Sequence, residues 1–191
     1  MISLQKEITM KFYLLLSVVC LSTVLFSCKN DTKKAEPEVI TIETTPEKKL
    51  HLSSKTEAEF NDLKVAAIYN SYIELKTALV NTNPELSALA STKLLLAYAE
   101  AEMMDEGTLA AIESIKTETD VEAQRKAFVV VTNSVETMLE GALKSGTVYK
   151  QFCPMAFGNT GAYWLSNSKE IQNPYFGDKM LKCGRVASEI K

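Results

Sequence analysis

Residues 65–79 read Val-Ala-Ala-Ile-Tyr-Asn-Ser-Tyr-Ile-Glu-Leu-Lys-Thr-Ala-Leu, and this stretch decides the fold class. Its apolar side chains recur at steps of three and four, which places them on one face of a helix. These positions are Val65, Ile68, Tyr72, Leu75 and Leu79. A helix with such a face must bury it against other elements, so we expect helical structure from about residue 55 to form a core.

A second helix is signalled by Asn83, Pro84 and Glu85. Asparagine is a favoured N-cap, proline suits the first helical position, and an acidic side chain interacts well with the first turn. The face that we expect this helix to bury carries Leu86, Ala90, Leu94, Ala97 and Ala101.

A shorter helical pattern runs from Thr108 to Lys116, and a longer one follows it. Thr119 with Glu122 resembles a capping box, and Gly146 is placed to end the last helix. Three long helices and a short one, joined by short loops, predict a mainly α fold built as an antiparallel bundle.

The helical period stops after Gly146. Val148–Phe152 is aromatic and β-branched and predicts a short strand, and the Gly158–Gly161 segment predicts a tight turn. We therefore expect residues 147–186 to form a small irregular or β segment at the C-terminal end of the bundle, rich in cysteine, methionine and aromatic residues.

The N-terminus has the pattern of an export signal. Lys11 precedes a short apolar run, and Leu25-Phe26-Ser27-Cys28 resembles a bacterial lipobox. We expect residues 1–27 to be removed and Cys28 to carry the lipid that anchors the protein to a membrane. The alternative is an ordinary signal peptide that leaves Cys28 as a free thiol.

Residues 28–54 are polar and charged and contain two prolines, which predicts a flexible tether ahead of a single domain at 55–191. The only histidine, His51, lies in this tether and is expected to be solvated. The net charge of −3 gives no electrostatic reason to expect nucleic acid as a partner. We expect a location in the cell envelope, on the periplasmic or cell-surface side.

Two cysteines, Cys153 and Cys183, belong to the expected domain, and each has a methionine within three residues. Met155 follows Cys153 in Cys-Pro-Met, and Met180 precedes Cys183 in Met-Leu-Lys-Cys. An extended stretch brings the first pair to one side, and a helical turn does the same for the second. Thiolate and thioether are soft ligands and select Cu(I) among common metals.

The residues leave other readings open. Both methionines could fill gaps in a core, which is the commonest use of methionine. The two cysteines could form a disulfide, which on the chain-entropy model would stabilise the domain by about 3–4 kcal/mol. A metal centre can contribute as much, so energetics does not separate the two.

The C-terminal segment resembles a known family. The runs that carry the resemblance are Val-Tyr-Lys-Gln-Phe-Cys-Pro-Met-Ala from Val148, Gly-Ala-Tyr-Trp-Leu-Ser from Gly161, and Ile-Gln-Asn-Pro-Tyr-Phe-Gly-Asp-Lys-Met-Leu-Lys-Cys-Gly-Arg-Val from Ile171. They are similar to the domain of unknown function 3347. The helical stretches from Tyr72 and from Gln124 fit the same family, so the resemblance covers the domain from about Asp62.

The resemblance implies a role in handling metal. The family occurs in exported lipoproteins and at the C-terminal end of periplasmic adaptor subunits of heavy-metal efflux pumps, which makes such pump components candidate partners. It favours Cys153, Met155, Met180 and Cys183 as Cu(I) or Ag(I) ligands. The aromatic residues expected to wall the site, or to form the core of this segment, are Tyr163, Trp164, Tyr175 and Phe176.

No pattern in the sequence supports catalysis, since a positioned acid, base or nucleophile is missing from it. We therefore expect a membrane-tethered copper acceptor or chaperone and not an enzyme. The alternative is a disulfide-stapled helical interaction module that holds no metal. Ligand type alone does not distinguish copper, silver and mercury.

Overall fold

The computed structural model describes residues 50–191. The expected signal peptide, Cys28 and most of the expected tether lie outside these residues. Among the described helices, none is both long and apolar enough to cross a membrane.

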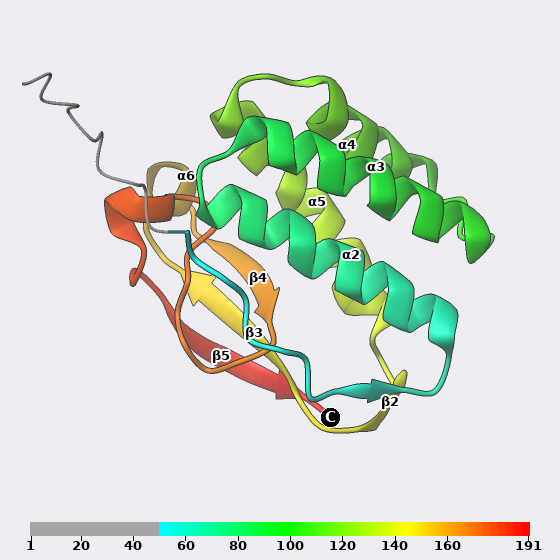
Figure 1. Ribbon diagram of the computed structural model, residues 1–191. Coiled ribbons are helices and arrows are strands. Elements are labelled where there is room, and N and C mark those ends of the chain that lie inside the picture. Colours follow the sequence, from blue (N-terminus) through cyan, green and yellow to red (C-terminus); the bar gives the residue numbers. More distant parts are fainter. Residues whose placement is uncertain (1–49) are drawn as a thin grey trace, which may run out of the picture. The chain divides into compact units, whose positions relative to one another are not determined.

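Four helices form the larger part of the fold, and each packs on the next along the chain (Figure 1). They are α2 (Leu63–Val80), α3 (Pro84–Glu100), α4 (Glu106–Thr117) and α5 (Val121–Met138). The loops between them are short, which makes neighbouring helices antiparallel. The mainly α fold class predicted from the sequence is confirmed.

Side-chain caps fix where these helices begin. Asn83 accepts a hydrogen bond from the backbone N–H of Leu86, and Pro84 occupies the first turn, as predicted. α2 begins at Leu63 and not near residue 55, because Asp62 caps it. α5 is capped by Asp120 and not by Thr119, so the predicted capping box is wrong.

The predicted apolar face of α2 is buried at every position, and Ile68, Tyr72, Leu75 and Leu79 are fully inaccessible. α3 differs from prediction, because Leu86 is 46% exposed. The buried face of α3 uses small residues instead, including Ser87, Ala90 and Ser91. Small side chains on α3 allow it to approach α2 closely.

The chain leaves the helical part earlier than expected. α5 ends at Met138, and Leu143–Ser145 forms β2, which pairs antiparallel with β1 (Glu59–Phe60). Gly146 is therefore not a helix C-cap. It has a φ of +82° in the link to the next strand, and a Cβ there would lie 2.5 Å from the carbonyl oxygen of Glu57.

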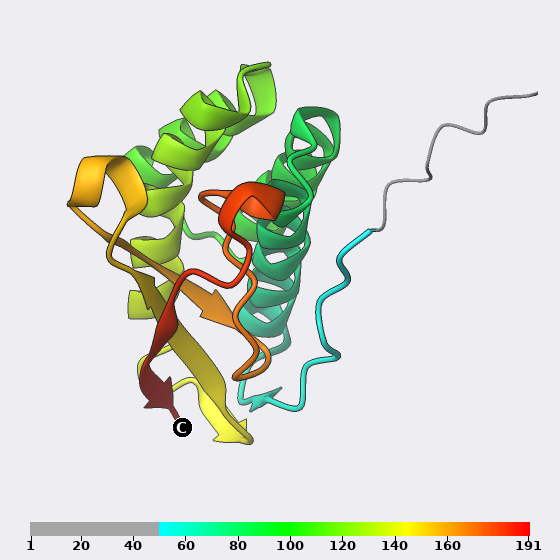
Figure 2. The same ribbon diagram turned by 90° about the vertical axis from the view of Figure 1, so that its left-hand side faces the viewer.

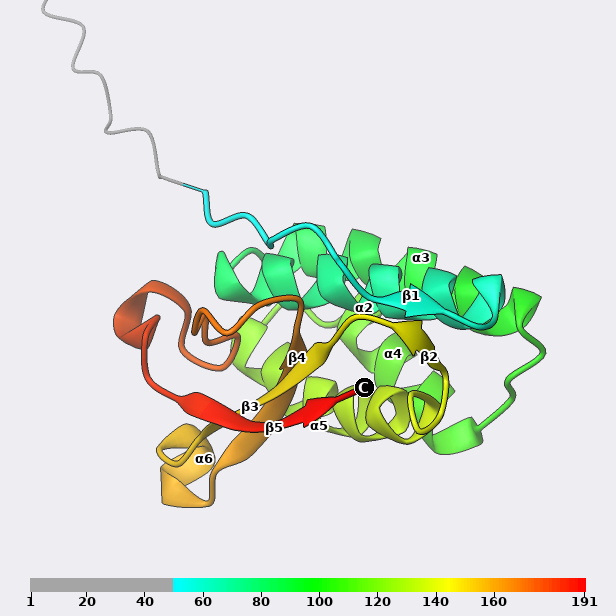
Figure 3. The same ribbon diagram turned by 90° about the horizontal axis from the view of Figure 1, so that it is seen from below.

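A three-stranded antiparallel sheet lies beside the helices (Figures 2 and 3). Its central strand is β3 (Val148–Cys153), flanked by β4 (Ala162–Ser166) and β5 (Arg185–Ile190). The short helix α6 (Ala156–Asn159) joins β3 to β4, and the 3₁₀ turn η1 (Gly177–Met180) lies in the long connection from β4 to β5. The predicted strand at Val148–Phe152 is confirmed.

One buried guanidinium ties the sheet region to the helices. Arg125 of α5 is 1% exposed and donates from Nε to the carbonyl of Pro174 at 2.7 Å. It also donates to the carbonyl of Leu79 and the hydroxyl of Thr82 at the end of α2, and pairs with Glu122 at 2.6 Å. The connection from β4 to β5 is thus fixed to both α2 and α5.

Candidate metal centre

Cys153 ends the central strand β3 and is fully buried. It pairs with Ala162 across the β3–β4 ladder, so its backbone position is set by the sheet. Pro154 follows and cannot donate a hydrogen bond to a continued strand. The chain turns away at Met155, which precedes α6.

Cys183 lies between η1 and β5 and is half-buried. Its N–H donates to the carbonyl of Met180 at 3.0 Å, and its carbonyl accepts from the side-chain amide of Asn173 at 2.7 Å. The next residue, Gly184, has no room for a side chain, because a Cβ there would lie 2.8 Å from the ring of Trp164.

The β3–β5 pairing brings the two cysteines together. Phe152 pairs with Arg185, which places the end of β3 beside the start of β5. The sulfur atoms of Cys153 and Cys183 are 3.1 Å apart, and both residues are free thiols. The two cysteines therefore lie together in the structure, but the extended stretch expected from Cys153 to Met155 is absent, because the chain turns at Pro154 and Met155.

The thiol–thiol contact changes the acidity of the pair. The hydrogen bond with Cys153 raises the pKa of Cys183 above its ordinary value, and burial adds to this effect. A protonated pair favours neither metal nor disulfide by itself, because both require loss of the thiol protons. Binding of a metal here must displace protons.

The distance between the two sulfur atoms is close to that needed for metal binding and to that needed for a disulfide bond. A metal held by two sulfurs at about 2.3 Å each requires them to lie roughly 4 Å apart. A disulfide bond requires about 2.05 Å. The observed separation of 3.1 Å lies between these values.

The two methionines beside the cysteines are not part of the hydrophobic core. Met155 is 46% exposed, and Met180 is half-buried at the end of η1. Neither belongs to the buried core cluster or to the side chains packed against it. A gap-filling role, which the sequence left open, therefore does not explain them.

A metal centre in this part of the chain would depend on sulfur. Across residues 50–191 no group of three or more His, Cys, Asp or Glu side chains is arranged to hold a metal ion. The two thiols would supply the anionic ligands, and the thioethers of Met155 and Met180 are the soft donors nearest to them in sequence.

The aromatic residues expected to wall the site are mainly core. Trp164 is fully buried and meets the ring of Tyr175 edge-on at 6.1 Å, and Tyr175 contacts Phe128 of α5 at 6.0 Å. Burial raises the pKa of Tyr175 well above its usual range, and the nearby Cys153 makes a smaller contribution. Phe176 is half-buried and packs against the same core.

The buried polar residues that the sequence analysis missed include Lys76, Arg125 and Asn173. Lys76 and Arg125 lie on helix faces otherwise occupied by apolar residues, and that position was the available signal. Burial lowers the pKa of Lys76 to about 8. Asn173 lies in irregular chain, where no periodic pattern exists to reveal it.

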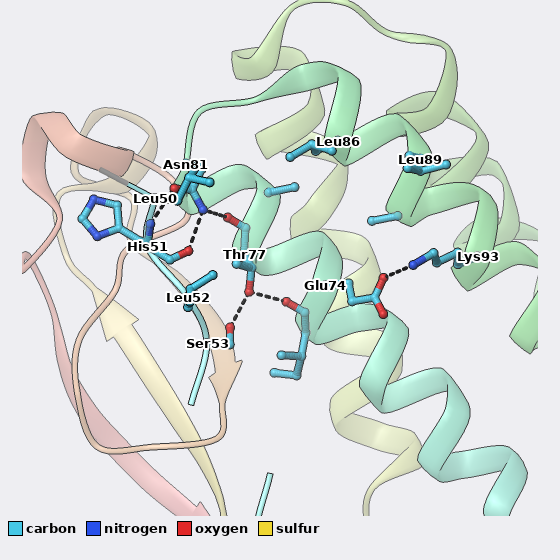
Figure 4. Close-up of a pocket in the computed structure, with 13 residues that line it drawn as sticks. Leu50, His51, Leu52, Ser53, Glu74, Thr77, Asn81, Leu86, Leu89 and Lys93 are labelled. Atoms are coloured by element: carbon cyan, nitrogen blue, oxygen red, sulfur yellow. Dashed lines mark hydrogen bonds and ion pairs between the residues drawn. The ribbon is translucent and has the colours of Figure 1, made fainter. Parts of the chain in front are cut away.

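The described end of the expected tether is bound to α2, as Figure 4 shows. The side chain of Asn81 accepts from the N–H of His51 and donates to its carbonyl, both at 2.8 Å. The imidazole of His51 lies 2.6 Å from the carboxylate of Asp178, with 18% of its side chain exposed. His51 is therefore not the solvated residue that the sequence predicted.

A pocket of about 500 Å³ lies between residues 50–53 and helices α2 and α3 (Figure 4). Its rim carries exposed leucines, and an ion pair of 2.6 Å between Lys93 and Glu74 lies on one side. None of the cysteines or methionines of the candidate centre lines it.

The family model described as a protein of unknown function, DUF3347, matches residues 68–146. This span covers most of α2 through β2 and ends before β3, so the Cys-Met motif lies beyond the match. No curated protein and no solved structure matches the chain.

Proposed function

We propose that this protein, whose residues 68–146 match the DUF3347 family model, binds a soft monovalent metal ion, Cu(I) or Ag(I), at Cys153 and Cys183. The observation that carries the proposal is the 3.1 Å separation of two free sulfurs, brought together by adjacent strands and by a loop that Asn173 holds. Two thiolates at this spacing form a bidentate soft site after a small rotation.

The surroundings of the thiols support the same reading. Met155 and Met180 lie within three residues of them in the sequence and are not among the core side chains, so their thioethers are candidates to complete the coordination of the ion. Cys153 and the nearby Trp164 are fully buried, so one side of the pair faces the core, while Cys183 is half-buried. A sulfur-rich ligand set stabilises Cu(I) over harder ions.

The metal would be carried and not transformed. We propose an acceptor or chaperone in the cell envelope, anchored through lipid on Cys28 and exchanging its ion with components of a heavy-metal efflux pump. The anchor rests on the lipobox-like Leu25–Cys28, and the pump connection rests on the family resemblance of the C-terminal motif. No catalytic role is proposed.

A second candidate function is favoured by the same contact. Two free sulfurs 3.1 Å apart are also placed to oxidise to a disulfide, since an approach of about 1 Å is needed. The protein would then be a stapled helical module that docks onto an envelope partner and holds no metal.

One experiment separates these candidates. The full chain is purified anaerobically, its free thiols are counted, and Cu(I) is titrated against a competing chelator with the thiols kept reduced. Two free thiols and tight binding of one Cu(I) support the carrier. Thiols that are already bonded to each other on isolation, with no retained metal, support the stapled module.

A further inference from the structure

The methionines of the described residues fall into two groups, and only one of them adjoins the thiols. Met103, Met104 and Met138 line a single open pocket of about 590 Å³ formed by the end of α3, the start of α4 and the end of α5. We propose that this pocket is a second site for Cu(I) or Ag(I), built from thioether ligands and independent of the cysteines.

Two of the three thioethers are held in place by the fold. Glu102 adopts a φ of +58°, and the N–H of Met103 donates to the carbonyl of Tyr98 at 3.1 Å, which closes the C-terminal turn of α3. This closure fixes Met103, which packs against the core. Met138 ends α5 and packs against the core in the same way.

The third thioether is not used for packing. Met104 belongs to the lining of the same pocket, but its side chain is 69% exposed. An unbranched thioether has low energetic barriers between its conformers, so Met104 can close over an ion held by the other two. Three soft neutral donors are a ligand set that selects Cu(I) or Ag(I).

The charges around the pocket favour a cation. Its lining contains one carboxylate, Asp105, and no lysine or arginine. The exposed Glu100, Glu102 and Glu106 lie close to Met103 and Met104 in the sequence. Neutral thioethers leave the charge of a bound ion uncompensated, and the Asp105 carboxylate in the lining offsets part of it. An apolar peptide would gain nothing from the same acidic surroundings.

The chemistry of this site differs from that of the thiol pair. A thioether has no proton to lose, so an ion binds at the methionines without proton release. Its affinity should be nearly constant between about pH 5 and pH 7, whereas affinity at the cysteines falls as pH falls. The two sites are therefore distinguishable in one titration.

The test uses the full chain labelled with ¹³C at the methionine methyl groups. Silver nitrate is added in chloride-free buffer, and the methyl resonances are followed by NMR after assignment with single Met→Leu variants. The expected result is that Met103, Met104 and Met138 shift together and saturate with a common midpoint. Shifts that are absent, or that differ in midpoint between the three, overturn the proposal.

Two variants sharpen the result. Met104→Leu keeps the size and apolar character of an exposed side chain but removes one ligand, so the midpoint at Met103 and Met138 should rise roughly tenfold or more. Leu63→Met places a lone thioether at a position 85% exposed, and its methyl should not respond in the same silver range. An equal response from this lone methionine contradicts a built site.

Discussion

The side-chain amide of Asn173 donates to the carbonyl of Cys183 at 2.7 Å, across ten residues of irregular chain. Asn173 is fully buried and also accepts from the N–H of Tyr175 at 2.8 Å, while its own N–H donates to the carbonyl of Leu181. One side chain thus holds the loop that carries Met180 and Cys183. The thiol pair depends on a residue that touches neither sulfur.

The first prediction concerns this residue. Asn173→Ala leaves the carbonyl of Cys183 without its partner in a buried place, which should cost about 1–3 kcal/mol of unfolding free energy. Cu(I) affinity should also fall, because Cys183 loses its fixed position. Asn61→Ala, which removes exposed side-chain hydrogen bonds to the carbonyls of Gly141 and Leu143, is the control. Equal Cu(I) affinity in both variants would show that Asn173 does not position the site.

The second prediction concerns the ligands. Cys153→Ser or Cys183→Ser should each weaken Cu(I) binding by several orders of magnitude, because each removes an anionic soft donor. Met155→Leu or Met180→Leu should weaken it by roughly one or two orders. A chelator competition assay measures all four. Reduced wild-type protein that binds Cu(I) no better than the double serine variant would refute the metal proposal.

The acidity of the pair gives a third prediction. Because the Cys153 contact raises the pKa of Cys183, a bound ion must displace a proton from the Cys183 thiol. Cu(I) affinity should therefore rise steadily with pH from about 6 to 9 and level off once the thiols are ionised. An affinity that does not change over this range would point to ligands other than the cysteines.

The single tryptophan offers a direct signal of occupancy. Trp164 is fully buried, and its ring abuts Gly184, next to Cys183. Binding of Ag(I) at the thiols should change its emission with the same midpoint as the loss of thiol reactivity. The change should be absent when both cysteines are serine. An unchanged spectrum at full thiol occupancy would place the ion elsewhere.

Lys76 makes a prediction about stability and pH. Burial lowers its pKa in the folded protein to about 8, so folding below that pH requires a charge to be buried or a proton to be lost. This penalty is greatest below about pH 8 and disappears as pH rises towards 10.5, the ordinary pKa of lysine. The free energy of unfolding of the protein should therefore rise with pH over this range as far as Lys76 is concerned.

Lys76→Met keeps the buried stem and removes the charge. It should raise the free energy of unfolding at pH 7 by about 1–3 kcal/mol, with a smaller gain at pH 9.5. Lys64→Met, at an exposed position, should show no such pH dependence. Chemical denaturation at the two pH values measures the difference. A Lys76→Met protein that is less stable at pH 7 would contradict this account.

Local signals predicted much of the helical part. The Asn83–Pro84 start could be read from residue types because both act within one turn. Leu86 has the spacing of the buried face, but it lies in the first turn of α3 and lines the open pocket beside residues 50–53, so it stays 46% exposed. Gly146 was misassigned because a positive φ serves a strand link as well as a helix end.

The candidate centre was predicted only in its ligands. The soft-ligand chemistry of Cys153 and Cys183 is a property of residue type, so their pairing could be anticipated. The contacts that hold the two cysteines together could not be anticipated. The β3–β5 register and the hydrogen bonds of Asn173 join residues that are distant in the sequence. Arg125 and Lys76 could have been noticed as charges on apolar faces, but their partners on distant segments have no sequence signature.

The buried guanidinium of Arg125 has a consequence for where this chain can be cut into a smaller piece. The match to the family model ends at residue 146. Arg125 lies inside the matched span, but its Nε donates to the carbonyl of Pro174, which lies outside it. A fragment cut at residue 146 would lose the Pro174 carbonyl and, with it, the link from the guanidinium to the β4–β5 connection. The matched span is thus shorter than the set of contacts by which Arg125 holds α2, α5 and that connection together.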